Sequence, residues 1–444
     1  ICYYLNMLDI KFIRENPDIV KDAALKKKVE VDIDTLIKVD DERREIMTDV
    51  EKERSEQNEF SKKIVSATSE EEKSKMISEM QVLKSRLQEK EEKLKEITKK
   101  WFALMIKIPN IPSVDTPIGP DESGNKVIRE WGEKPKFNFE PKAHWDLGRE
   151  LGIINTEKAA EVSGARFSYI LGDLAMLQVG LLNFVFGILI NEETLKVIAE
   201  EADLSISTKP FIPVFPPIMM KSAIMNKMGR LQPVDERYYF EKDDMVFIGS
   251  AEHTLGPLHM DEILQEDDLP KRYVGYSVAM RREAGTYGKD TKGILRQHQF
   301  DKIEMETFCL PENSYKEQDF IVAIQEYILR KLKIPHHVVM ICTGDMGGPD
   351  HRQIDMECWM PGQNAYKETH TSDLMQGFQA RRLNTRVKRK NGQIEHVHMN
   401  DATAAAMGRT LIAIMENYQQ ADGSIIIPEV LRPYMGSKEK ISKK

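Results

Sequence analysis

Cysteine is scarce in this sequence, with four residues in 444, no CxxC pair and no dense framework. A disulfide scaffold is therefore excluded, and reduced thiols in the cytoplasm are predicted. Three histidines, His336, His337 and His370, have no metal-ligand spacing with these cysteines. We interpret them as structural and predict no zinc site.

The sequence also lacks an apolar run of the roughly 20 residues that a bilayer requires. Its longest apolar stretch, Ala175 to Ile190, is interrupted by Gln178 and Asn183 and is predicted to be a buried helix. The first residues, ICYYLNMLDIK, have neither the charged region nor the cleavage site of a signal peptide. These features predict a cytoplasmic protein without a membrane partner.

An excess of positive charge is absent as well, because the formal net charge is -8. Such a chain is not coated with basic residues for bulk nucleic-acid binding, so any RNA contact must use a local basic surface. With 41% hydrophobic and 31% charged residues, the chain can bury a sizeable core and form two or three domains.

Between residues 34 and 104 the apolar residues follow the spacing of a coiled coil. One register is Leu36, Val39, Ile46, Val50, Phe60 and Ile64, and the other is Met76, Met80, Leu83, Leu87, Leu94, Ile97, Trp101 and Leu104. Polar residues interrupt both registers, namely Arg43, Glu53, Gln57 and Lys90. With Ser69 as the cap of the second helix, two helices of about 35 residues form an antiparallel arm roughly 50 Å long.

Two uses of this arm fit its pattern. Heptads most often serve dimerisation, whereas basic residues along the helices could contact RNA phosphates. Acidic residues are equally dense there, and a solvated helix of mixed charge has the same pattern.

Composition divides the rest of the chain. Residues 1–110 contain the arm and residues 111–135, rich in Pro, Gly and Asp, are predicted to be a linker. Residues 136–444 are predicted to form a compact domain with helices and strands. Near its end, Ala402 to Tyr418 is predicted to be an amphipathic helix that carries Arg409 near its start.

The residues best suited to chemistry concentrate between Met280 and Glu306, in MRREAGTYGKDTKGILRQHQFDKIEME. On a strand, Arg281 and Glu283 would share a face, because strand side chains alternate. Thr286 to Gly293 is predicted to be a loop, and Leu295 to Met305 a returning strand that places Phe300 near Arg281. A guanidinium, a carboxylate and an aromatic ring suit a nucleotide, while the alternative is a charged surface hairpin with ordinary cross-strand pairs.

The sequences MRREAG and RQHQFDKIE resemble the second signature hairpin of class II aminoacyl-tRNA synthetases, in the seryl-tRNA synthetase form FRxEAG and RxHQFxKxE. The similarity extends from Met7 to Gly436, and the chain is identified as a member of this family, of the bacterial type. Members typically begin at a Met like Met7, so residues 1–6 are interpreted as an extension or a mis-assigned start.

The resemblance implies an α+β fold, in which helices flank the antiparallel class II sheet and a helical hairpin precedes it. It implies that the enzyme activates L-serine with ATP to seryl-adenylate and transfers it to the 3′ end of tRNA(Ser), and also of tRNA(Sec). The arm would then grip the long variable arm of the tRNA. The segment PFIPVFPPIM resembles the first class II signature, which implies a homodimer interface ending near Pro217.

The resemblance also implies which residues bind the nucleotide. Arg281 would hold the substrate carboxylate and the α-phosphate, and Arg409 the γ-phosphate, and these two are the expected catalytic residues. Glu283 would accept from the adenine amine, Phe300 would stack on the base, and Arg296 would bind the outer phosphates.

Magnesium is the second implied cofactor. Glu368 and Thr371 occupy the family positions that ligate Mg²⁺ between the ATP phosphates, and oxygen ligands are what this ion prefers. Taken alone, ETHTS is equally a strand end with hydroxyl groups.

The implied serine-binding residues are Ser250, Glu252, Arg281, Glu304, Asn400 and Thr403. Ser250 stands where the family usually has Thr, which keeps a hydroxyl. The usual NGSG or NGTG before Arg409 is here NDAT; Thr403 falls on its hydroxyl position, and Asn400 is one residue further from Arg409 than usual. Glu304 and Thr403 offer the hydrogen bonds that distinguish a small hydroxylated substrate.

Two alternatives remain within the resemblance. A paralogue that charges a carrier protein would lack a tRNA-gripping arm, whereas this chain has a long one. A non-catalytic RNA-binding relative would be expected to lose the ATP arginines, yet Arg281, Arg296 and Arg409 are all present.

Overall fold

The structure, a computed structural model, describes residues 8–66, 68–283 and 291–443. The chain divides into two compact units, Met7–Pro109 and Asn110–Lys444. The first six residues lie outside the described part, as does most of the loop expected over Thr286–Gly293.

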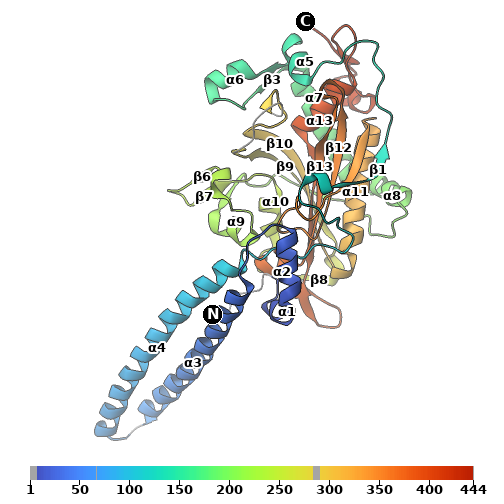
Figure 1. Ribbon diagram of the computed structural model, residues 1–444. Helices are drawn as coiled ribbons and strands as arrows, with labels where there is room; N and C mark the ends of the chain where they lie inside the picture. Colours follow the sequence, from blue (N-terminus) through green and yellow to red (C-terminus); the bar gives the residue numbers. More distant parts are fainter. Residues whose placement is uncertain (1–7, 67, 284–290, 444) are drawn as a thin grey trace. The chain divides into compact units, whose positions relative to one another are not determined.

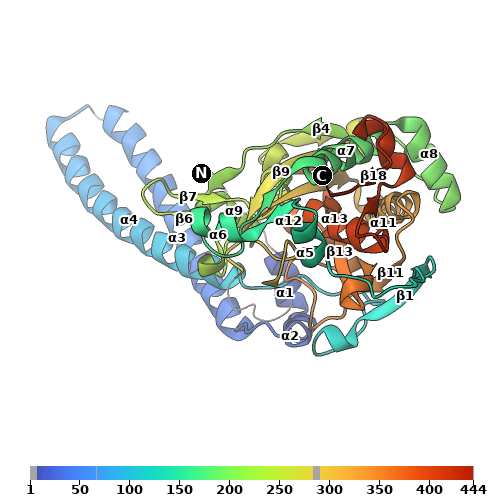
Figure 2. The ribbon, with the colours of Figure 1, turned by 90° about the horizontal axis from the view of Figure 1, so that it is seen from above.

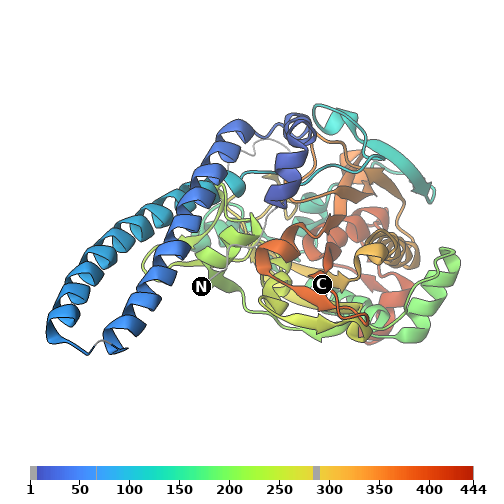
Figure 3. The same ribbon diagram turned by 90° about the horizontal axis from the view of Figure 1, so that it is seen from below.

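Helices are the regular secondary structure of the N-terminal unit in the part that the structure describes. Its helices are α1 (Ile10–Glu15), α2 (Pro17–Lys26), α3 (Ile33–Ser66) and α4 (Glu70–Met105). The two long helices run side by side in all three views (Figures 1, 2 and 3), which confirms the predicted helical hairpin. Ser69 caps α4 as expected, because its side chain accepts a hydrogen bond from the backbone N–H of Glu72.

Two of the polar residues that interrupt the heptad registers, Glu53 and Lys90, meet across the hairpin. Glu53 is only 5% exposed and lies 3.0 Å from Lys90 and 2.7 Å from Arg86. Nearer the base of the hairpin, the Arg43 guanidinium lies 4.5 Å from the centre of the Trp101 ring. A thin two-helix core therefore accommodates charged residues by pairing them.

The second unit is organised around a sheet of eight described strands in the order β1-β11-β12-β13-β16-β10-β9-β4. Their bounds, in that order, are Lys126–Trp131, His336–Met340, Arg352–Met360, Ala365–Gln376, His398–Ala406, Gln299–Cys309, Lys271–Met280 and Ile212–Val214. Neighbours pair antiparallel except β4, which pairs parallel with β9. This arrangement confirms the expected α+β class II fold.

Helices flank this sheet. They are α5 (His144–Glu150), α6 (Thr156–Ser163), α7 (Gly172–Leu189), α8 (Glu192–Glu201), α9 (Ser222–Met228), α10 (Glu252–Leu255), α11 (Ser314–Lys331), α12 (Phe378–Leu383) and α13 (Met407–Asn417). Smaller strands form separate ribbons: β2 (Ile154–Asn155) with β3 (Tyr169–Ile170), β5 (Met219–Lys221) and β6 (Tyr239–Phe240) with β7 (Met245–Phe247), β8 (Ile263–Gln265) and β15 (Ile394–His396) with β14 (Arg386–Lys388), and β17 (Ile425–Ile426) with β18 (Lys440–Ile441). From α11, Gln325 donates to the Thr371 and Thr403 carbonyls, which ties this helix to β13 and β16.

Two segments differ from the prediction made from sequence. Ala402–Ala406 belongs to strand β16, and the helix begins only at Met407. These residues pair with β10, and Ala402 pairs with β13 as well, so non-local pairing overrides the helix propensity of alanine. Within the segment predicted as a linker, Lys126–Trp131 forms the edge strand β1, whose mostly exposed side chains give no alternating signal.

Helix α7 contains the long apolar stretch, but it is buried on one face rather than all round. Leu177, Leu181 and Val185 are buried, whereas Met176 and Val179 are exposed. Among the described residues it is the one helix long and apolar enough to cross a membrane, a test that core helices of soluble proteins also pass. Helix α7 therefore presents apolar side chains such as Met176 and Val179 on its exposed face.

Candidate active site

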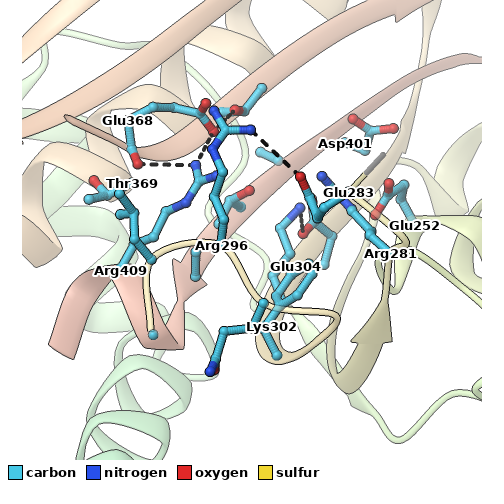
Figure 4. A pocket seen from close by; sticks show the side chains of 18 of the residues that line it. Glu252, Arg281, Glu283, Arg296, Lys302, Glu304, Glu368, Thr369, Asp401 and Arg409 are labelled. Carbon is cyan, nitrogen blue, oxygen red and sulfur yellow. Dashed lines mark hydrogen bonds and ion pairs between the residues drawn. The ribbon is translucent and has the colours of Figure 1, made fainter. Parts of the chain in front are cut away.

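A pocket of about 310 Å³ lies over the central strands β10, β13 and β16 and the first turn of α13. Figure 4 shows two ends: Arg296, Glu368, Thr369 and Arg409 gather at one, which we call the Arg409 end. At the other, the acidic end, Glu252 and Asp401 lie near Arg281, with Glu304 and Lys302 between the ends. The pocket therefore brings arginines and carboxyl groups together at both ends, Arg296 and Arg409 with Glu368 at one and Arg281 with Glu252 and Asp401 at the other.

Arg281 and Phe300 meet as the sequence predicted. Phe300 pairs with Ala279 across β9 and β10, and the Arg281 guanidinium lies 5.4 Å from the Phe300 ring centre. Arg281 is held in place because its Nε donates to the Gly249 carbonyl at 3.0 Å. This leaves the remaining guanidinium N–H groups to face the pocket.

Glu283 also lines the pocket, but strand alternation is not the reason. Strand β9 ends at Met280, and Glu283 adopts a left-handed backbone with φ of 48°. Its carboxylate lies 3.6 Å from the Arg296 guanidinium. The expectation that Arg281 and Glu283 share a strand face was therefore wrong, although both reach the same cavity.

At the Arg409 end, the Arg409 guanidinium is paired with the Glu368 carboxylate. Arg409 Nη1 donates to Glu368 Oε1 at 2.8 Å and to the Glu368 carbonyl at 3.1 Å. Thr371 Oγ1 lies 3.5 Å from Glu368 Oε1. On the neighbouring strand, burial and the charge of Glu368 raise the pKa of Asp355 well above its usual value. Oxygen atoms that could serve as metal ligands therefore lie close together where β12 and β13 pass beside α13.

Glu304, beside the acidic end, is almost fully enclosed, with only 2% of the residue exposed. It lies 2.6 Å from Lys302 Nζ, and its Oε2 accepts from Ser250 Oγ at 3.0 Å. Burial, aided by the charge of Glu252, raises the pKa of Glu304 to about 8 despite Lys302. Burial also disfavours the Glu252 carboxylate, yet Lys302 and His253 hold its pKa well below the usual value. Glu252 is therefore the more acidic of these two carboxyl groups.

Ser250 and Asn400 do not line the pocket. Ser250 lies behind Glu304 and accepts from Lys302 Nζ at 3.0 Å, so it holds other pocket residues. Asn400 is fully buried and donates to the Ser314 carbonyl at 3.1 Å, beneath α11. Because strand side chains alternate, Asn400 faces the opposite side of the sheet from Asp401 and Thr403.

Asp401 and its partner Arg230 are pocket residues that the sequence reasoning missed. Arg230 Nη2 lies 3.2 Å from Asp401 Oδ2; the Asp401 side chain is almost enclosed, and the Arg230 side chain is partly exposed. Burial raises the pKa of Asp401 to about 7, while Arg230 opposes the rise. If residues 402–406 had been predicted as a strand, alternation would have placed Asp401 on the same face as Thr403. Arg230, far away in sequence, gave no such signal.

Lys302 and Thr369 were also missed. Lys302 lies between Phe300 and Glu304 in a run of alternate residues on β10, so alternation alone would have found it. Thr369 lines the pocket because the register shifts between Met356 and Glu357 on the paired strand β12. A bulge of this kind has no reliable sequence signature.

Comparisons with known proteins cover both units. Residues 7–112 match the family model of the seryl-tRNA synthetase N-terminal domain, and residues 238–418 match that of the tRNA synthetase class II core domain (G, H, P, S and T). The chain is 40% identical to a serine–tRNA ligase of Thermodesulfovibrio yellowstonii and 41% identical to one of Thermotoga neapolitana. Each alignment covers 97% of this chain and 99% of the relative.

Solved structures agree with these sequence matches. A crystal structure of seryl-tRNA synthetase from Pyrococcus horikoshii complexed with ATP superposes with a TM-score of 0.84 at 34% identity, over 99% of this chain and all of that one. The cytoplasmic serine–tRNA ligase of Naegleria fowleri in complex with AMP gives a TM-score of 0.80 at 28% identity. Both similarities extend over the whole chain rather than over one domain.

Proposed function

The chain belongs to the seryl-tRNA synthetase family, and on this premise we propose that it activates serine with ATP and passes the seryl group to the 3′ end of tRNA(Ser). The same transfer is proposed for tRNA(Sec), and the enzyme is expected to act in the cytoplasm. The observation that carries the proposal is the meeting of Arg281, Arg409 and Glu304 in one pocket on the sheet face.

The nucleotide would bind across the pocket towards the Arg409 end. Arg281 is proposed to hold the α-phosphate and the serine carboxylate, while Arg296 and Arg409 bind the outer phosphates. Phe300, already 5.4 Å from the Arg281 guanidinium, would stack on adenine, and Glu283 would accept from its amine. Arg296 and Arg409 are paired with Glu283 and Glu368 in this structure, so phosphates would exchange partners with these carboxylates.

The residues of the pocket could bind magnesium only if the phosphates of ATP supply further oxygen ligands. Among the described residues no group of three or more His, Cys, Asp or Glu side chains is suited to hold a metal ion. Glu368 and Thr371 nevertheless bring a carboxylate and a hydroxyl within 3.5 Å of each other. Because Mg²⁺ is commonly bound by one or two carboxylates plus substrate phosphates, we propose that these two residues hold it there. When bound, the ion neutralises phosphate charge.

Serine is proposed to bind at the acidic end. Its ammonium group would lie among Glu252, Glu304 and Thr403, and the added positive charge favours ionisation of Glu304. Its hydroxyl would accept and donate hydrogen bonds inside a buried site, so an analogue without it leaves buried groups unpaired. Asp401, held by Arg230, closes this end of the pocket.

The chemistry requires positioning more than covalent help. The serine carboxylate attacks the α-phosphorus, the bond to the bridging oxygen breaks, and pyrophosphate leaves with that electron pair. Arg281 contacts both the nucleophile and the α-phosphate, so one guanidinium aligns them and offsets their mutual repulsion. Arg409 stabilises negative charge on the departing pyrophosphate.

The helical hairpin is proposed to bind the tRNA. It belongs to a compact unit of its own, Met7–Pro109, with long solvated helices of mixed charge. Binding would rely on phosphate contacts and shape, because exposed lysines and arginines read no bases by themselves.

A homodimer is proposed from the apolar surface on α7 and around β4. Exposed apolar side chains gather there, namely Met176, Val179, Ile212, Phe215 and Ile218. Figure 2 shows α7, β4 and β9 along the same side of this unit. Exposed apolar side chains on elements of one side favour an interface, and identical chains commonly associate through the same surface on each copy.

Serine-dependent ATP–pyrophosphate exchange tests the proposed function directly. We expect serine to support exchange in the presence of magnesium and to exceed threonine, alanine and glycine. Exchange driven better by one of those three would overturn the substrate assignment. Absence of exchange with all four amino acids would reject activation of these substrates.

A further inference from the structure

A buried histidine outside the pocket connects two of the pocket walls. His144 on α5 and Glu416 on α13 are both completely enclosed, and His144 Nδ1 lies 3.1 Å from Glu416 Oε1. On the other side of the ring, the backbone N–H of Ile294 donates to His144 Nε2 at 3.1 Å. One imidazole thus joins a helix to a pocket-lining segment.

The hydrogen bonds assign the protonation of this imidazole. A backbone N–H only donates, so Nε2 must be the acceptor and Nδ1 must carry the proton given to Glu416. Glu416 is itself fixed, because its Oε2 accepts from the Gly362 N–H at 2.9 Å and its Oε1 from the His144 N–H at 3.0 Å. The ring therefore has a single orientation in which every polar atom is satisfied.

Both ends of this connection lead to phosphate-binding candidates. Ile294 begins a pocket-lining stretch that includes Arg296 and ends at Gln297. Glu416 follows Arg409 by seven residues on α13, about two turns, which places them on the same side of that helix. The imidazole therefore fixes the segment that carries one arginine relative to the helix that carries the other.

Two glycines show how closely the segment is held. Gly293 has a left-handed φ of 65°, and a Cβ added there would overlap His144 Nε2. A Cβ added to Gly408, the residue before Arg409, would lie 3.1 Å from the Ile294 carbonyl oxygen. Ile294 is thus held by the imidazole through its N–H and closely approached by the start of α13 at its carbonyl.

We propose that His144 is a positioning residue that sets the separation of Arg296 and Arg409 for the ATP triphosphate. This inference rests on the proposed binding of ATP in this pocket. A misplacement of about 1 Å in such a clamp costs binding and rate far from the altered residue. The effect is expected on ATP rather than on serine, because Glu252, Glu304 and Asp401 lie on α10, β10 and β16 and not on α13 or the segment that begins at Ile294.

Two substitutions of His144 test its hydrogen bonds to Ile294 and to Glu416 separately. His144→Asn is too short to reach Ile294 but retains a donor near Glu416. His144→Gln reaches Ile294 with an acceptor and gives up the Glu416 contact. We expect His144→Asn to weaken ATP binding about tenfold in calorimetry and to raise the ATP KM in exchange equally, with the serine KM within twofold. His144→Gln should stay within about threefold of the wild type.

Controls distinguish positioning from folding. His336→Asn removes another fully buried imidazole that is not part of the pocket, and should lower Tm without changing ATP affinity. If His144→Asn lowers Tm yet leaves ATP affinity unchanged, the inference is refuted. If His144→Asn fails to fold, ATP binding is measured in Glu416→Gln, which alters the side chain that holds the imidazole. Unchanged ATP affinity in this variant refutes the inference, and a loss of affinity supports it.

Failure of the proposed function has a different signature. A wild type that binds ATP without serine-dependent exchange overturns the serine assignment alone, and the calorimetric comparison of the variants still decides the role of His144. A wild type that does not bind ATP overturns both.

Discussion

Replacing Glu304 with Gln tests the acidic end with the least change of shape. The carboxylate lies 2.6 Å from Lys302 and 3.0 Å from Ser250, so Gln keeps the volume but removes the charge. If Glu304 binds the ammonium group of serine, the variant loses a charge-assisted hydrogen bond in a buried site. Such bonds contribute about 1.5–3 kcal/mol, which corresponds to roughly ten- to hundredfold in serine kcat/KM.

The pH dependence offers a second readout of the same substitution. Burial raises the pKa of Glu304 to about 8. In the wild type, serine kcat/KM should therefore rise as pH increases through about 8, because the free enzyme must ionise to accept from the ammonium group. This rise should be absent in Glu304→Gln. The two profiles are measured by pyrophosphate exchange at saturating ATP.

Stability should respond with a defined sign. The folded-state pKa of Glu304 is raised above the unfolded value of about 4.3, so the folded protein holds a proton that the unfolded chain releases. Its contribution is fully present below about pH 4.3 and is lost as pH rises through about 8, with a magnitude on the order of a few kcal/mol. Glu304→Gln should flatten this part of the stability profile in denaturant titrations.

Glu306→Gln is the matched control for this prediction. Glu306 lies two residues further along β10 and is equally enclosed, but it does not line the pocket. Serine kinetics should stay within twofold of the wild type. Unchanged serine kinetics in Glu304→Gln, or equal losses in both variants, would refute a direct role of Glu304 and favour a structural ion pair with Lys302.

Three further predictions address other parts of the chain. Asp401→Asn and Arg230→Gln should each raise the serine KM several-fold. The double variant should recover part of this loss, because neither charge is then left unpaired, and additive effects would contradict the pairing. Deleting Asp34 to Lys99 with a short linker should spare exchange and abolish tRNA charging, and charging that survives would favour the dimerisation interpretation of the arm. Phe215, 79% exposed, should be part of the dimer interface, so Phe215→Asp should yield monomers in analytical ultracentrifugation, and an unchanged mass would argue against this interface.

The parts of the fold predicted from sequence are those specified by local periodicity. The coiled-coil arm follows from apolar spacing and the Ser69 cap, both of which act within a few turns of helix. The meeting of Arg281 and Phe300 follows from one antiparallel hairpin, whose pairing joins residues close in sequence. In both cases the determining contacts are local.

The parts that sequence could not provide depend on distant pairing. The second half of strand β16, Ala402–Ala406, has the local pattern of a helix, and its pairing with β10 makes it a strand. That misassignment concealed the alternation that turns Asp401 and Thr403 towards the pocket and Asn400 away from it. Arg230 reaches Asp401 across 171 residues of sequence, a pairing that no local pattern predicts.

The true start of α13 also explains why Arg409 lies where it does. A cation in the first turn of a helix faces the positive end of the helix dipole and is disfavoured there. Arg409 is the third residue of α13, a helix with no acidic residue in its first turn. Its position therefore requires a nearby anion, and Glu368 supplies one at 2.8 Å. A phosphate bound at the same place would be attracted by both the guanidinium and the helix N-terminus, so binding ATP relieves the unfavourable placement that the free enzyme offsets with Glu368.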